Sequence, residues 1–170
     1  MSQTSVATSL TRAFAGMLAD NGPHDIIPGY NGEASAEMPF GVVVNLTTTE
    51  QKYELPDGGA DILGGVIVHS HAYSKGPSDP ALGTTGIKSK FTLSVLRKGR
   101  IYMTVENGCS PGDRLYTRIV AGAGGSQKGA VRTTDPGGGE VIDSRSMMVA
   151  LSTAAAAGVA VVDCDFTNKP

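Results

Sequence analysis

Two histidines stand one residue apart at the end of an apolar run, in the segment VIVHSHAY (66–73). On a β-strand, residues i and i+2 project from the same face, so His69 and His71 would point in one direction. Paired imidazoles of this kind can supply two ligands of a metal ion, and a complete site needs three or four. The histidine pair therefore raises the question of whether the sequence offers the other ligands.

The residues that follow the pair do not complete a familiar metal pattern. Cupins place a glutamate a few residues after their HxH pair, and AYSKG (72–76) contains none. Tyrosine and serine stand where a metallo-β-lactamase has aspartate and histidine, and His24 has no spacing that makes it a third ligand. We therefore expect a strand that ends in a loop, with no metal and no cofactor. A cupin-like metal-dependent enzyme that uses His69 and His71 is the alternative.

Other catalytic signatures are missing from the sequence. It contains no nucleophile elbow, no P-loop and no HExxH motif. Asp163 and Asp165 share one face of an expected strand, but two solvated carboxylates at the end of a strand explain them without chemistry. The sequence thus predicts a protein that is not an enzyme.

Composition limits the class of protein further. The 170 residues are 18% charged and 40% hydrophobic, with 23 glycines, 9 prolines and no tryptophan. Such a chain suits many short strands joined by turns, within one domain. A net charge of −2 argues against a general nucleic-acid binder. The most apolar run, 149–162, is shorter than the roughly 20 residues that span a bilayer, so we expect no membrane segment.

The two cysteines do not form a CxxC motif, so we expect free thiols and synthesis in a reducing compartment. Cys164 alternates with Ala160, Val162 and Phe166, which places it on the core face of a terminal strand.

Alternating apolar residues locate the strands. The clearest pattern is FTLSVLR, Lys98-Gly99 and RIYMTVE, which predicts a tight hairpin with a solvated basic tip at RKGR (97–100). The other expected strands are 40–46, 62–70, 114–121, 146–151 and 158–166. We predict an all-β fold, a single jelly-roll-like β-sandwich or barrel over 39–170, preceded by an extended N-terminal arm over 1–38. Residues 72–88 are expected to form a long outward loop.

Several segments, taken in order, resemble the structural cement (decoration) proteins of tailed bacteriophages. The matching segments are AFAGMLAD (13–20), AEMPFGVVV (36–44), ILGGVIV (62–68), SVLRKGRIYMTVENGCSPGDRLYTRI (94–119) and AAGVAVVDCDF (156–166). No single segment is specific, and their order along the chain carries the resemblance.

The resemblance implies a non-enzymatic virion protein on the outside of an icosahedral head. Its partner would be the major capsid protein of the same phage, and it would associate with itself, as a dimer by base rate or as a trimer. It would pass through the host cytoplasm during assembly. We expect the arm and the 72–88 loop to contact the shell, with Phe14, Met17, Leu18 and Tyr30 as apolar anchors. Phe14, Met17 and Leu18 could equally pack on the core of their own domain.

A glycan-binding β-sandwich module is a further alternative. Sugars stack on aromatic faces, and the few candidates are Tyr73, Tyr102 and Tyr116.

Overall fold

The computed structural model describes residues 13–70, 86–122 and 127–167. Within these ranges the chain forms strands and no helix, so no described segment is a helix that could cross a membrane. The strands are β1 (Asp25–Asn31), β2 (Met38–Pro39), β3 (Val43–Leu46), β4 (Lys52–Glu54), β5 (Leu63–Ile67), β6 (Gly86–Ile87), β7 (Thr92–Val105), β8 (Tyr116–Arg118), β9 (Val131–Arg132), β10 (Val141–Ile142), β11 (Met148–Ala150) and β12 (Gly158–Asp165). The all-β prediction is confirmed.

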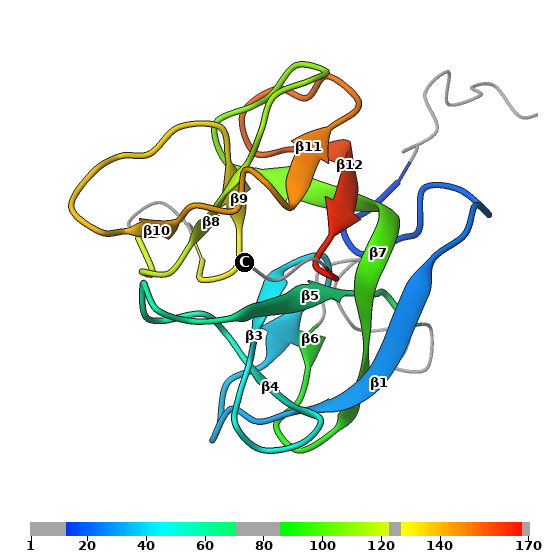
Figure 1. Ribbon diagram of the computed structural model, residues 1–170, viewed down its shortest axis with the longest axis vertical. Coiled ribbons are helices and arrows are strands. Elements are labelled where there is room, and N and C mark those ends of the chain that lie inside the picture. Colours follow the sequence, from blue (N-terminus) through cyan, green and yellow to red (C-terminus); the bar gives the residue numbers. More distant parts are fainter. Residues whose placement is uncertain (1–12, 71–85, 123–126, 168–170) are drawn as a thin grey trace, which may run out of the picture.

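Five strands close into a barrel, in the lower half of Figure 1. Their order is β1-β4-β3-β5-β7, and β7 pairs back onto β1. All neighbours are antiparallel except β1 and β4. These strands supply most of one apolar cluster, whose members are Met38, Phe40, Val42, Val44, Tyr53, Ile67, Ile87, Leu93 and Val95. The barrel form of the predicted fold is therefore confirmed.

The upper half of Figure 1 is a second sheet region built on the continuation of β7. There β12 pairs with β7 and β11, and β8 pairs with β9 and β10. A second apolar cluster fills this half, and Val43, Leu63 and Val66 of the barrel strands join it. Because β5 has apolar clusters on both faces, all five of its residues are buried.

The predicted hairpin at 91–106 is wrong. Its two halves are one strand, β7, which runs 14 residues through Lys98-Gly99 without reversing. The first half pairs with β1 and β5, and the second half pairs with β12. Gly99 has a φ of 133°, and bending of the strand at this glycine replaces the expected turn. Pairing of both halves with distant strands therefore determines the conformation at Lys98-Gly99, which this dipeptide alone does not predict.

A bulge accompanies this bend. Asp25 lies opposite Lys98 and Ile26 lies opposite Leu96, so Arg97 is an extra residue in β7. Just before the bulge β7 is buried on both faces, since Val95 belongs to the barrel cluster and the adjacent Leu96 belongs to the other cluster.

The segment that we expected to be an extended arm is described from residue 13 onward. From there residues 16–19 bond to β7, a turn and bends precede residue 25, and residues 25–31 are the barrel strand β1. The remainder of the expected arm, 1–12, and most of the expected 72–88 loop lie outside the described residues.

The final pair of predicted strands is confirmed as β11 and β12, which are antiparallel neighbours. Cys109 and Cys164 are both free, as expected, and both are buried, which was predicted only for Cys164. Cys164 lies in the upper apolar cluster together with Ala160, Val162 and Phe166.

Candidate functional site

His69 contacts the N-terminal segment of the chain. Its ring lies between two phenyl rings, with centroid distances of 4.5 Å to Phe14 and 4.5 Å to Phe40. Its backbone N–H donates to the carbonyl of Gly16 at 2.7 Å. The apolar run that leads to His69 is β5, and the residue lies just past the end of that strand. The sequence correctly placed His69 at the end of a strand but did not indicate these contacts.

No metal site surrounds this histidine in the part of the chain that the structure describes. There, no group of three or more His, Cys, Asp or Glu side chains could hold a metal ion. His24 lies in another loop, with Nδ1 2.8 Å from the carbonyl oxygen of Gly22. His71 falls outside the described residues, so the expected pairing of the two imidazoles is not tested.

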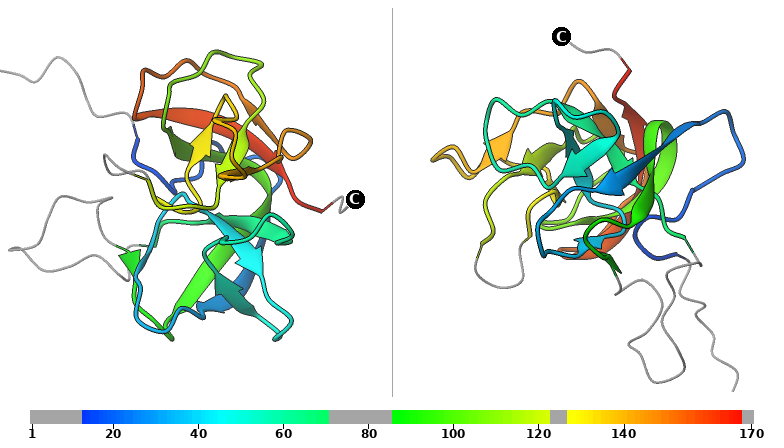
Figure 2. Two further views of the ribbon diagram at one scale, coloured as in Figure 1. Left: turned by 90° about the vertical axis from the view of Figure 1, so that its left-hand side faces the viewer. Right: turned by 90° about the horizontal axis from the view of Figure 1, so that it is seen from below.

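Residues 13–19, which we call the docked segment, lie along the second half of β7. The N–H of Gly16 donates to the carbonyl of Tyr102 at 2.8 Å, and the N–H of Tyr102 donates to Met17 at 2.8 Å. Ala19 continues the ladder by donating to Arg100 at 2.9 Å. Leu18 lies opposite Ile101 and packs on the upper apolar cluster. In Figure 2 these residues, in blue, lie against the half that contains β12.

The close approach of the docked segment depends on Gly16, which has a φ of +88°. A Cβ at this position would lie 2.7 Å from Cβ of Phe40 and 3.0 Å from the backbone nitrogens of Gly41 and His69. Only glycine combines this backbone angle with this spacing.

Three of the four predicted anchors belong to the docked segment, and all four are half-buried. Phe14 contacts His69, and Leu18 contacts the core, so both pack on their own domain. Tyr30 lies on β1, opposite Lys52 of β4 and Thr92 of β7. The structure thus brings Phe14, Met17 and Leu18 together and leaves Tyr30 on a different strand.

The basic residues that we expected at a solvated tip lie within β7 and face acidic side chains. Lys98 lies 2.8 Å from Asp165, and Arg100 lies 3.0 Å from Asp20. The hydrogen bond from Lys98, followed by those from Thr167, lowers the pKa of Asp165 to about 2. The tip interpretation was wrong because there is no turn at this place.

An uncharged loop at the top of Figure 1 is an exposed apolar feature that the sequence analysis missed. We call residues 151–159 the alanine loop; Leu151 is 40% exposed, Val159 is 36% exposed, and residues 155–157 are exposed alanines. Ala154 exchanges two backbone hydrogen bonds with Cys109, of 2.9 and 3.0 Å. The signal was present in the apolar run 149–162, which we examined only as a membrane segment.

The alanine loop and the docked segment meet at one hollow of about 320 Å³. Its walls are Ala13, Tyr102, Ser152, Thr153, Val159 and Val161. We call the hollow and the exposed residues of the alanine loop the contact face. This face carries apolar and neutral polar groups, which suits recognition of another protein better than recognition of an ion.

Comparison with known proteins gives a consistent result. A family model described as structural cement protein (E217 gp24/Pam3 gp6) matches residues 2–165. No curated protein matches the chain. Among solved structures, a chain of "The capsid of Myoviridae Phage XM1" has a TM-score of 0.69, with 18% identity and 96% of each chain covered. At that identity the likeness shows a shared fold.

Proposed function

The chain belongs to the structural cement protein family of bacteriophages, and on this premise we propose that it binds the outside of an icosahedral head. There it would bridge neighbouring copies of the major capsid protein and stabilise the shell without catalysing a reaction. The observation that carries the proposal is the family match over residues 2–165. The fold shared with a chain of a phage capsid supports it.

We propose the contact face as the part that binds the shell. Burial of its apolar side chains would supply affinity, and the absence of charge in the alanine loop avoids a desolvation cost. Each copy need bind only weakly, because many copies on one shell, or linked copies, gain by multivalency. Tyr30 remains a proposed second contact, while Phe14, Met17 and Leu18 would act mainly by fixing the docked segment. The part of the arm before residue 13 and the 72–88 loop are proposed to extend the contact.

Self-association is proposed as well, with a dimer favoured by base rate and a trimer as the alternative. Light scattering of the purified protein distinguishes these two states from a monomer.

The test is co-sedimentation of the purified protein with heads that lack it, both expanded and unexpanded. We expect saturable binding at a fixed ratio to the shell protein, and a shell that resists heat and chelators better once it is decorated. Absence of binding to both kinds of head would refute the proposal. So would undecorated heads that are as resistant as decorated ones.

Two variants separate the contact face from the rest of the surface. Val159→Glu places a charge in the contact face, and we expect head binding to weaken about tenfold or more because that charge would be buried. Ile62→Glu places the same charge at a residue that is 53% exposed and lies in the barrel half. This control is expected to bind like the unaltered protein. Equal head binding by both variants would show that the interface lies outside the contact face.

A further inference from the structure

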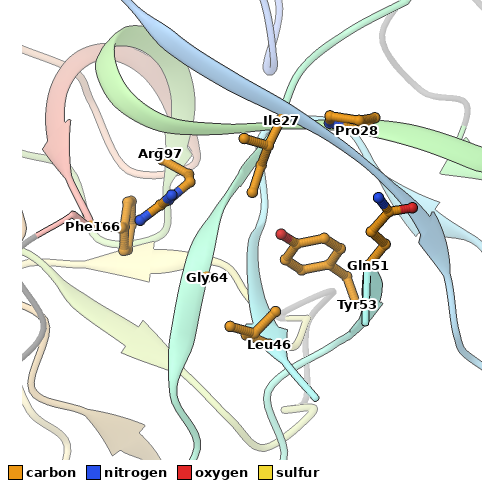
Figure 3. Close-up of a pocket in the computed structure, with 8 residues that line it drawn as sticks. All are labelled: Ile27, Pro28, Leu46, Gln51, Tyr53, Gly64, Arg97 and Phe166. Carbon is orange, nitrogen blue, oxygen red and sulfur yellow. The ribbon is translucent and has the colours of Figure 1, made fainter. Parts of the chain in front are cut away.

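A pocket of about 350 Å³ opens at one end of the closed barrel. Every barrel strand takes part in it: β1, β3, β5 and β7 each line it, and β4 contributes Tyr53. Figure 3 shows apolar walls of Ile27, Pro28, Leu46 and Phe166, with Arg97 beside Phe166. The mouth of a β-barrel is a common place for a small-molecule site, and this volume lies at the lower end of the usual range.

Both bulges of the barrel lie at this pocket. Val44 pairs with Gly65 and Asn45 pairs with Leu63, so Gly64 is an extra residue in β5, as Arg97 is in β7. Bulges at the rim of a barrel redirect side chains. The bulge in β7 accounts for the position of a cationic side chain, Arg97, in a lining that is mainly apolar.

The aromatic ring of Tyr53 is fixed by two glycines. A Cβ on Gly29 would lie 2.5 Å from ring carbons of Tyr53, and a Cβ on Gly64 would lie 2.8 Å from another. The ring therefore occupies the space that side chains on β1 and β5 would fill, and its hydroxyl points toward the open pocket in Figure 3. Burial raises the pKa of this phenol, which keeps it a neutral hydrogen-bond donor.

The charge of Arg97 remains available at the rim. Its closest carboxylate among the described residues is that of Asp25, at 3.9 Å, longer than the roughly 2.7–2.9 Å of a charge-assisted hydrogen bond. The side chain of Arg97 is 33% exposed. The pocket thus combines the guanidinium of Arg97, the phenol of Tyr53 and the amide of Gln51 with apolar walls, and its lining contains no carboxylate.

We propose that this pocket binds a small free molecule with an apolar body and a single carboxylate. The body would lie against Ile27, Leu46 and Phe166, and the carboxylate would accept hydrogen bonds from Arg97 and Tyr53. This site is separate from the contact face, and it does not depend on the role in the capsid.

The test uses hexanoate, with hexanol and hexylammonium as probes of the same chain length. Each is titrated into the ¹⁵N-labelled full chain, and shifts of the backbone amides of Gly64 and Phe166 report binding. We expect hexanoate to bind with a dissociation constant of about 1 mM or lower. Hexanol is expected to bind about tenfold more weakly, because it lacks the charge-assisted bond, and hexylammonium not to bind.

Matched variants test whether Arg97 recognises the carboxylate of the ligand. Arg97→Gln should weaken hexanoate binding about tenfold while changing hexanol binding less than about threefold. Arg100→Gln removes a nearby charge of β7 outside the pocket and should change neither. Should Arg97→Gln fail to fold, Arg97→Lys is expected to retain hexanoate binding and Tyr53→Phe to weaken it several-fold.

Three results would overturn the proposal. The first is no shift of either amide at about ten times the expected dissociation constant. The second is equal binding of hexanoate and hexylammonium. The third is that Arg97→Gln and Arg100→Gln change hexanoate binding equally or, where Arg97→Gln does not fold, that Arg97→Lys and Tyr53→Phe do so.

Discussion

Replacing Gly16 by alanine tests whether the docked segment is held as closely as its contacts indicate. The new Cβ would meet Cβ of Phe40 at 2.7 Å and two backbone nitrogens at 3.0 Å. Two of these three contacts are backbone atoms, so no rotamer change relieves the overlap. The φ of +88° adds a conformational cost of about 1–2 kcal/mol for a residue with a side chain.

An upper bound on the loss of stability comes from the alternative response, in which the docked segment detaches from β7. Lifting would break four backbone hydrogen bonds, those donated by Gly16, Ala19, His69 and Tyr102. At a net value of about 1 kcal/mol each, their loss costs roughly 4 kcal/mol. Because the protein adopts the less costly response, we expect Gly16→Ala to lower the free energy of unfolding by about 2–4 kcal/mol.

Urea denaturation followed by circular dichroism measures this change, and amide exchange locates it. The N–H groups of His69 and Tyr102 donate to the docked segment, so their exchange should accelerate more than that of core strands. Gly59→Ala is the control, since no heavy atom lies within 4 Å of its Cβ position and its φ is not positive. If the free energies of unfolding of the two variants differ by less than about 0.5 kcal/mol, the docked segment does not depend on the close contacts of Gly16.

Three further predictions concern charge and burial. Glu106→Gln should lower the free energy of unfolding by about 2 kcal/mol in urea titrations, because it removes the closer carboxylate of Arg118, at 2.8 Å, and leaves that guanidinium, which is 7% exposed, with only Glu140 at 3.2 Å. An unchanged midpoint would contradict this. The folded-state pKa of Asp165, about 2, lies below its unfolded value of about 3.9, so the stabilisation by Lys98 is complete above that value and lost as pH falls toward 2. In acid titrations Asp165→Asn should therefore remove this part of the pH dependence, and an identical acid transition would refute the assignment. Burial raises the pKa of the Cys164 thiol, so Ellman's reagent should label it only after unfolding, and labelling of the native protein would show that the strand opens.

The position of His69 shows which features a local sequence pattern can predict. An apolar run followed by polar residues correctly predicted the end of a strand, because strand alternation depends on neighbours in sequence. The contacts of His69 with Phe14 and Phe40 come from two other segments, and no spacing within VIVHSHAY indicates them. The strand end could therefore be predicted from the sequence, and the aromatic contacts of His69 could not.

The long strand β7 was misassigned for a related reason. Lys98-Gly99 between two alternating runs fits a two-residue turn, but a glycine at positive φ fits a bend within one strand as well. What decides is that β1 and β12 supply partners to consecutive halves of β7. The barrel pocket could not be predicted for the same reason, since the bulges that shape it exist only relative to neighbouring strands.

The two parts of the contact face are anchored to the same strand, which bears on how it would bind. The docked segment bonds to β7 through Tyr102, and the alanine loop leads into β12, whose Val159 lies opposite Thr104 of β7. A surface held by such pairing loses little conformational freedom on binding, so more of the free energy of apolar burial remains as affinity. The backbone hydrogen bonds of the docked segment to β7 also hold Ala13 in the wall of the hollow.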